Sequence, residues 1–209
     1  AQRENYTRFV DEFTRRIRHI GCDDISLLLY GSYARGTFQP GVSDIDGLLV
    51  VPGDVVTDKE VLWKCARAYR SAQVTGDNHV SVEFTVSDWT TLRDGRFSPY
   101  GTDLFDYIRS EHCIVVGNDP REVMHCEGMR RDLLTSLAHN LRKVRMTLFL
   151  GPYQHCYDPP AFVSSVKKTF DKVTRASTQI LRLRDGTLER ERFGALAQLK
   201  EAYPSLDIS

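Results

Sequence analysis

The sequence predicts an α+β protein in which a small mixed β-sheet with associated helices is followed by a C-terminal helical part. Short apolar runs that end at glycines or polar turns occur up to residue 116, whereas longer segments with helical spacing fill the remainder. The turn sequence Gly-Asn-Asp-Pro at residues 117–120 separates the two regions. Strands therefore precede helices, and we expect two domains, residues 1–120 and residues 121–209.

The composition is that of an ordinary globular protein. Its 209 residues are 41% hydrophobic and 27% charged, which suffices for a sizeable core. Lys and Arg together number 28, as do Asp and Glu, so the chain has no net positive charge that would attract nucleic acid or an anionic membrane.

The cysteines and the apolar segments bear on the cellular compartment. The five cysteines include no Cys-x-x-Cys pair, and no long apolar span occurs, so we expect a cytoplasmic protein without a membrane partner.

The first predicted helix ends near Gly21. Its apolar residues recur every three or four positions and form one buried stripe: Tyr6, Phe9, Val10, Phe13, Ile17 and Ile20. Apart from Ser26, residues 25–30 form a short apolar run, which predicts a strand covered on both faces, and a second strand is expected at 44–51. Residues 57–73 predict a helix whose acidic first turn complements the helix dipole.

Strict alternation predicts a third strand at residues 80–86. Val80, Val82, Phe84 and Val86 share one face, which turns the carboxylate of Glu83 away from the apolar side. Two short helices are expected around Trp89 and Phe105, followed by a brief strand at residues 113–116. Beyond the turn, helices are predicted at 121–150, 160–183 and 188–202, with loops at 151–159 and 185–186.

Polar residues between the first two strands indicate a site for a charged ligand. Asp44 and Asp46 stand two apart on a predicted strand, so their side chains project from one face about 6 to 7 Å apart. Such carboxylates can share divalent ions, and Mg²⁺ keeps much of its shell for water and substrate phosphates. Gly31 permits close backbone approach, Ser32 can donate to a phosphate oxygen, and Arg35 adds a counter-charge.

These residues resemble the signature of the polymerase-β-like nucleotidyltransferase superfamily. The matching motifs are Gly-Ser-Tyr-Ala-Arg-Gly-Thr at residues 31–37 and Ser-Asp-Ile-Asp at residues 43–46. The resemblance implies that residues 1–120 are a nucleotidyltransferase domain, in which Asp44, Asp46 and Glu83 hold two Mg²⁺ ions. It also implies that Gly31, Ser32, Arg35 and Ser43 contact the nucleotide. Members of this superfamily transfer a nucleoside monophosphate from a triphosphate to an acceptor and release pyrophosphate.

Residues 175–204 resemble the last helices of streptomycin- and spectinomycin-type aminoglycoside adenylyltransferases. The resemblance implies that residues 121–209 bind acceptor and nucleotide, and that ATP is the donor. Arg175 and Arg190 are the nearest equivalents of that family's phosphate-binding cations. Arg175 is displaced by about a turn, and Arg190 stands where the family has lysine.

Three functions compete on this sequence. The favoured one is transfer of a nucleotide, expected to be AMP, to a hydroxyl of a small molecule such as an aminoglycoside-like antibiotic. The second is a toxin-type enzyme that modifies a protein or tRNA, and the third is a non-catalytic nucleotide-binding module. Glu83 either completes a metal shell or accepts the acceptor's proton.

Charged side chains offer two alternative acceptor surfaces. A cationic acceptor needs carboxylates, and candidates that could border a cleft between the domains are Asp103, Asp106, Glu111 and Asp158. A tRNA acceptor needs a basic strip, and the candidates are Arg130, Arg131, Arg142, Lys143 and Arg145. Three His-Cys dipeptides, at residues 112, 125 and 155, do not have the spacing of a zinc finger or ribbon.

Overall fold

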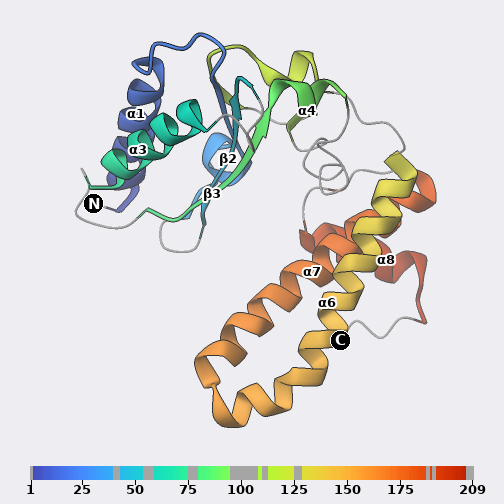
Figure 1. Cartoon of the computed structure of the whole chain (residues 1–209). Helices are drawn as coiled ribbons and strands as arrows, with labels where there is room; N and C mark the ends of the chain where they lie inside the picture. Colours follow the sequence, from blue (N-terminus) through green and yellow to red (C-terminus); the bar gives the residue numbers. More distant parts are fainter. Residues whose placement is uncertain are drawn as a thin grey trace. The chain divides into compact units, whose positions relative to one another are not determined.

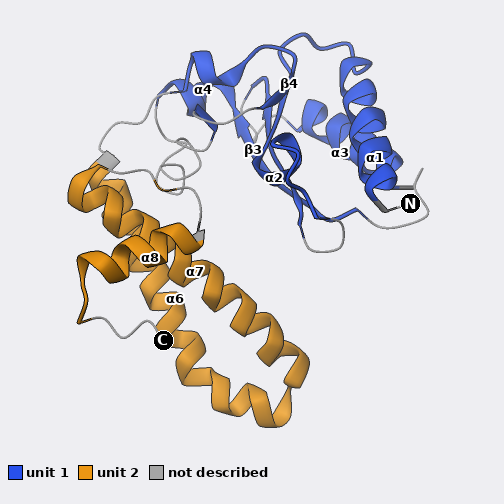
Figure 2. Cartoon of the chain, turned by 180° about the vertical axis from the view of Figure 1, so that it is seen from behind, with its two compact units in different colours: residues 1–127 blue, residues 128–209 orange. Residues whose placement is uncertain are grey.

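The computed structural model describes residues 2–39, 43–53, 59–74, 80–94, 108–109, 113–124, 129–186, 189 and 192–205. The chain divides into two compact units, residues 1–127 and residues 128–209 (Figure 2). The first unit contains the β-sheet and the second is helical. The predicted α+β class, with a small mixed sheet and C-terminal helices, is confirmed.

The first unit is built on a mixed β-sheet, in which β2 and β3 are labelled in Figure 1. Its four strands have the order β3-β2-β1-β4. Strand β1 is Ser26–Tyr30, β2 is Ile45–Val51, β3 is Val82–Asp88 and β4 is Ile114–Val116. Strand β1 pairs antiparallel with β2 and β4, whereas β2 pairs parallel with β3. The helices α1 (Gln2–Arg18) and α3 (Glu60–Val74) flank the sheet, and α2 (Gly31–Ala34) and α4 (Trp89–Arg93) follow strands directly.

Both faces of β1 are covered, as its apolar run predicted. Leu27 and Leu29 pack in the cluster that contains the apolar stripe of α1 and residues of α3. Leu28 lies on the opposite face, in a cluster with Leu48 and Leu92. Strand β1 therefore has no solvent-exposed face, and its four leucine and serine positions before Tyr30 are all buried.

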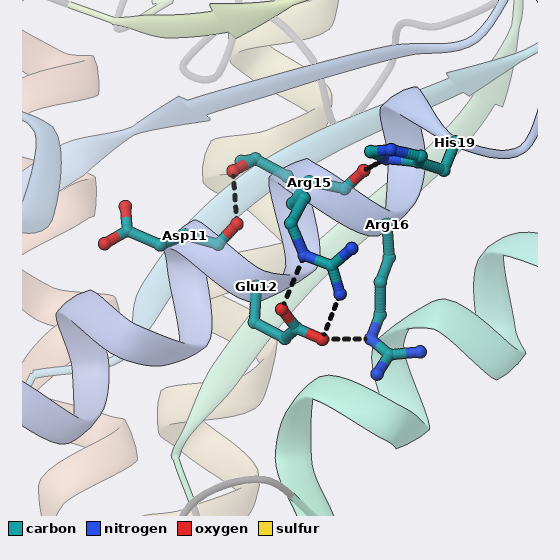
Figure 3. Close-up of polar contacts among 6 residues, drawn as sticks. Asp11, Glu12, Arg15, Arg16 and His19 are labelled. Atoms are coloured by element: carbon teal, nitrogen blue, oxygen red, sulfur yellow. Dashed lines mark hydrogen bonds and ion pairs between the residues drawn. The ribbon is translucent and has the colours of Figure 1, made fainter.

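The first helix has the predicted division into an apolar inner face and a charged outer face. Phe13 and Ile17 are buried, whereas the carboxylate of Glu12 accepts hydrogen bonds from the guanidinium groups of Arg15 at 2.7 Å and Arg16 at 2.6 Å (Figure 3). These bonds, chiefly the one from Arg15, lower the pKa of Glu12 to about 2. His19 contacts the carbonyl of Arg15 at the end of the helix.

The third strand differs in one detail from the prediction. Val82 and Phe84 pack on the helical face, but Val86, expected beside them, is 41% exposed. Strand β3 is an edge strand, and the apolar cluster of the helical face does not extend to Val86. The predicted helix around Trp89 is present as α4, and the one around Phe105 lies outside the described residues.

The second unit consists of α6 (Met129–Tyr157), α7 (Pro159–Asp185) and α8 (Arg192–Ala202). Buried polar side chains join α6 to α7, because Gln179 donates to the hydroxyl of Ser136 at 2.8 Å and accepts from Asn140 at 3.2 Å. Leu181 of α7 packs against apolar residues of α8. Among the described helices, none is long and apolar enough to cross a membrane.

The predicted start and end of the first long helix are wrong. A 3-10 turn occupies Pro120–Glu122, where Asp119 accepts from the backbone and guanidinium of Arg121, and α6 is described as Met129–Tyr157. At the other end α6 continues through Pro152 to Tyr157, where a loop was expected. Beyond Pro152, the ring centroid of His155 lies 5.1 Å from that of Phe162 on α7, so the continued helix contacts its neighbour.

Candidate active site

The first site element is the sharp junction between β1 and α2. Gly31 has φ +73°, a left-handed conformation that non-glycine residues rarely adopt. A Cβ on Gly31 would overlap Oδ2 of Asp46 and lie 3.1 Å from its Cγ. The backbone of this junction therefore reaches the Asp46 carboxylate at a distance that only glycine allows.

The sheet register places Asp46 and Glu83 side by side. In the parallel pairing of β2 with β3, Asp46 is opposite Glu83, and in the antiparallel pairing with β1 it is opposite Tyr30. Neighbouring strands lie about 4.8 Å apart. Phe84, the residue after Glu83, packs on the helical face, so the two carboxylates share the other face of the sheet. Glu83 is exposed and Asp46 is half-buried.

Asp44 lies just before the first residue of β2 and is exposed. Its neighbour Ser43 is joined to Gln39 by two hydrogen bonds: the N–H of Ser43 donates to the carbonyl of Gln39 at 2.8 Å, and its hydroxyl accepts from the N–H of Gln39 at 3.2 Å. In the described part of the chain, neither Asp44 nor Glu83 is paired with a cation. These two carboxylates are therefore open to a cationic ligand.

The segment after Gly31 is held by its own backbone. The carbonyl of Gly31 accepts from the N–H of Arg35 at 3.1 Å, and that of Ser32 accepts from Thr37 at 3.0 Å. Ser32 is half-buried and Arg35 is exposed. Both residues stand within four positions of the junction, so they belong to the same end of the sheet as Asp46.

The donor set suits Mg²⁺, because all three predicted ligands offer hard carboxylate oxygens. Yet no three acidic, His or Cys side chains among the described residues lie close enough to hold a metal ion together. The register brings together Asp46 and Glu83, whereas Asp44 stands at the margin, ahead of the strand. No metal cluster is formed either by those residues of the His-Cys dipeptides that the structure describes, among them Cys113 and Cys156.

Asp88, the other acidic residue of β3, does not join this site. It is buried at the far end of the strand, opposite Val51, and its carboxylate caps α4 by accepting from the N–H of Thr91 at 2.7 Å. Glu83 is therefore the carboxylate of β3 that stands beside Asp46.

The other predicted residues lie in the second unit or outside the described residues. Arg175 is exposed on α7, and Asp158 caps α7 by accepting from the N–H of Ala161 at 3.2 Å. The five basic candidates of α6 are exposed. Four predicted residues lie outside the described residues: Arg190, Asp103, Asp106 and Glu111.

Sequence reasoning missed one residue that supports the site. The side-chain amide of Gln73, in the last turn of α3, bonds both backbone groups of Val80, just ahead of β3. The sequence gives no signal for this contact, because the glutamine bonds to backbone groups, which every residue carries, and not to a particular side chain.

Comparison with known proteins supports the superfamily resemblance. Residues 9–76, which include β1, α2 and β2, match the model of the nucleotidyltransferase domain family. The structure is similar to that of the spectinomycin adenyltransferase AAD(9) from Enterococcus faecialis, solved with ATP and spectinomycin. The TM-score is 0.52 at 11% identity, over 100% of this chain and 92% of that one. No curated protein sequence matches the chain significantly.

These findings confirm the resemblance in two respects. Residues 9–76, which match the model of the nucleotidyltransferase domain family, contain Gly31, Ser32, Asp44 and Asp46. The fold is similar to that of the spectinomycin adenyltransferase AAD(9), which agrees with the resemblance of residues 175–204 to streptomycin- and spectinomycin-type adenylyltransferases.

Proposed function

We propose that this protein is a metal-dependent nucleotidyltransferase that moves a nucleoside monophosphate, AMP in the favoured case, from a triphosphate to a hydroxyl group and releases pyrophosphate. The observation that carries the proposal is the pairing of Asp46 with Glu83 beside the Gly31 junction. Ionised carboxylates on neighbouring strands repel each other, so the arrangement favours cation binding.

Asp44, Asp46 and Glu83 would hold the Mg²⁺ ions. Bound there, Mg²⁺ would supply Lewis-acid stabilisation of charge on the attacking oxygen and on the leaving pyrophosphate. Asp46 is the central ligand of the proposal because it neighbours both Gly31 and Glu83. Asp44, which precedes β2, would complete the set once an ion draws the carboxylates together.

The remaining residues would orient the triphosphate and the acceptor. Ser32 and Arg35, with Ser43, would contact phosphate oxygens, to which a hydroxyl and a guanidinium donate well. Arg175 and Arg190 are proposed as further phosphate contacts from the helical unit. Glu83 would either bind metal or take the proton that the acceptor hydroxyl loses as it attacks the α-phosphate.

A small hydroxyl-bearing acceptor, such as an aminoglycoside-like antibiotic, is the favoured substrate. It is supported by the fold likeness to an adenyltransferase solved with spectinomycin. A protein or tRNA acceptor is the second candidate, because exposed cations occur along α6 and α7: Arg142, Lys143, Arg145, Lys167 and Lys168. Within the described part of the helical unit, none of these five forms an ion pair with a carboxylate.

One experiment separates these functions. The protein is incubated with Mg²⁺, each of four α-labelled nucleoside triphosphates and one acceptor class: an antibiotic panel, bulk protein or tRNA. Label on an antibiotic supports the favoured function, and label only on protein or tRNA establishes the toxin-type alternative. Nucleotide binding without transfer to any acceptor would leave the non-catalytic binding module as the correct function.

A further inference from the structure

One side chain joins the end of α3 to the segment that leads into β3. The Oε1 of Gln73 accepts a hydrogen bond from the N–H of Val80 at 3.1 Å, and its Nε2 donates to the carbonyl of Val80 at 2.8 Å. The Nε2 also donates to the hydroxyl of Tyr69 at 3.0 Å. The amide of Gln73 thus pairs with both backbone groups of one residue, as a residue of a neighbouring strand does.

This pairing occurs on the open edge of the sheet. Strand β3 is terminal in the order β3-β2-β1-β4, and the carbonyl of Ser81 accepts from the N–H of Ile45, next to β2. Successive residues of an extended chain direct their backbone groups to opposite edges, so those of Val80 face away from β2. Gln73 therefore satisfies edge groups that no strand of this sheet reaches.

The contact bears directly on Glu83. Val80 precedes Glu83 by three residues, and its side chain is buried in the cluster of the helical face. A slip of one residue in β3 would exchange the two faces of the strand and turn Glu83 towards α1 and α3. The hydrogen bonds of Gln73 oppose this slip, because they tie the residue at the entrance of β3 to a fixed position on α3.

We propose that Gln73 is a positioning residue for Glu83: by clamping the backbone of Val80, it holds the register in which Glu83 stands beside Asp46. This inference rests on the proposed function of that carboxylate pair. Gln73 touches neither substrate nor metal in this scheme and acts only through the position of β3. Its loss should therefore affect metal binding and turnover more than the binding of the triphosphate.

The test compares three variants of the full-length protein. Gln73→Met keeps the length of the side chain and removes both bonds to Val80, and Gln73→Asn keeps the amide but is one methylene too short. Tyr69→Phe is the matched control, because it removes the third bond of Gln73 and leaves the aromatic ring among Phe9, Phe13 and Phe84. Mn²⁺ binding to each protein without substrate is measured by electron paramagnetic resonance, and kcat and KM are measured with Mg²⁺ and ATP.

Both Gln73 variants should bind Mn²⁺ about tenfold or more weakly than wild type, as for other residues that orient a metal ligand. Their kcat should fall by about tenfold while the KM for ATP stays within about threefold, and Tyr69→Phe should match wild type. Circular dichroism identifies any variant that does not fold, and Gln73→Asn then replaces Gln73→Met.

Three outcomes would overturn the inference. In the first, the folded Gln73 variants keep a Mn²⁺ affinity and a kcat within about twofold of wild type. In the second, Tyr69→Phe lowers Mn²⁺ affinity and kcat as much as the Gln73 variants do. In the third, the wild-type protein binds no Mn²⁺. If the wild-type protein transfers no nucleotide but the Gln73 variants still bind Mn²⁺ more weakly than wild type, the proposed reaction is refuted and the positioning role is not.

Discussion

Replacement of Gly31 by alanine tests the close approach between the β1–α2 junction and Asp46. Two costs are expected. The left-handed backbone, at φ +73°, costs about 1 to 2 kcal/mol for a residue with a Cβ. The new methyl group overlaps Oδ2 of Asp46, so the carboxylate must leave its rotamer, which costs about 1 kcal/mol more. We expect Gly31→Ala to be destabilised by roughly 2 to 3 kcal/mol.

The matched control is Gly21→Ala. Gly21 has the same φ, +73°, but a Cβ there meets no atom within 4 Å, so this variant carries the backbone cost alone. Urea unfolding measures both stabilities, and transfer of labelled nucleotide measures activity. Displacement of a catalytic carboxylate by about 1 Å should lower the rate of Gly31→Ala by roughly a hundredfold, whereas Gly21→Ala should remain near wild type. Equal activity of the two variants would refute the assigned contact.

Further predictions concern the carboxylates and the buried thiol. Asp46→Asn should fold normally and lose on the order of a thousandfold in transfer rate, and a rate above a tenth of wild type would contradict its role as metal ligand. Glu83→Gln should reduce kcat far more than triphosphate affinity, which equilibrium binding of labelled ATP can distinguish. Burial raises the pKa of the Cys65 thiol to about 12, so iodoacetamide at pH 8 should label the exposed Cys156 and leave Cys65 intact until the protein unfolds. Because the raised pKa favours the neutral thiol in the folded state, this contribution to stability is complete below the unfolded pKa near 9. It should decline as the pH rises from 9 towards 12, and a Cys65→Ala variant should show a weaker alkaline decline in chemical denaturation.

Local patterns in the sequence determined most elements of the first unit. The apolar run of β1 predicted a strand covered on both faces, and the stripe of α1 predicted its buried side, because side-chain periodicity depends only on the backbone geometry of each element. The same reasoning predicted that the side chains of Asp44 and Asp46 project from one face where β2 begins. It also predicted that Glu83 points away from the helices, since the alternation of side chains along a strand does not depend on neighbouring strands.

Local patterns were insufficient where a contact joins distant segments. The helix α6 continues through Pro152, a residue that disfavours the helix interior, and its last turns contact α7 through His155 and Phe162. The exposure of Val86 follows from the place of β3 at the sheet edge, which alternation alone does not reveal.

The sequence by itself determined which residue types this protein offers for phosphate and metal chemistry, and on which face of its own strand each one stands. Only the tertiary structure decided that Glu83 is paired with Asp46, that Gly31 touches the Asp46 carboxylate, and that Gln73 holds the entrance of β3. The physical reason is that register and close approach depend on how separate strands and helices pack together, whereas periodicity is a property of each segment alone.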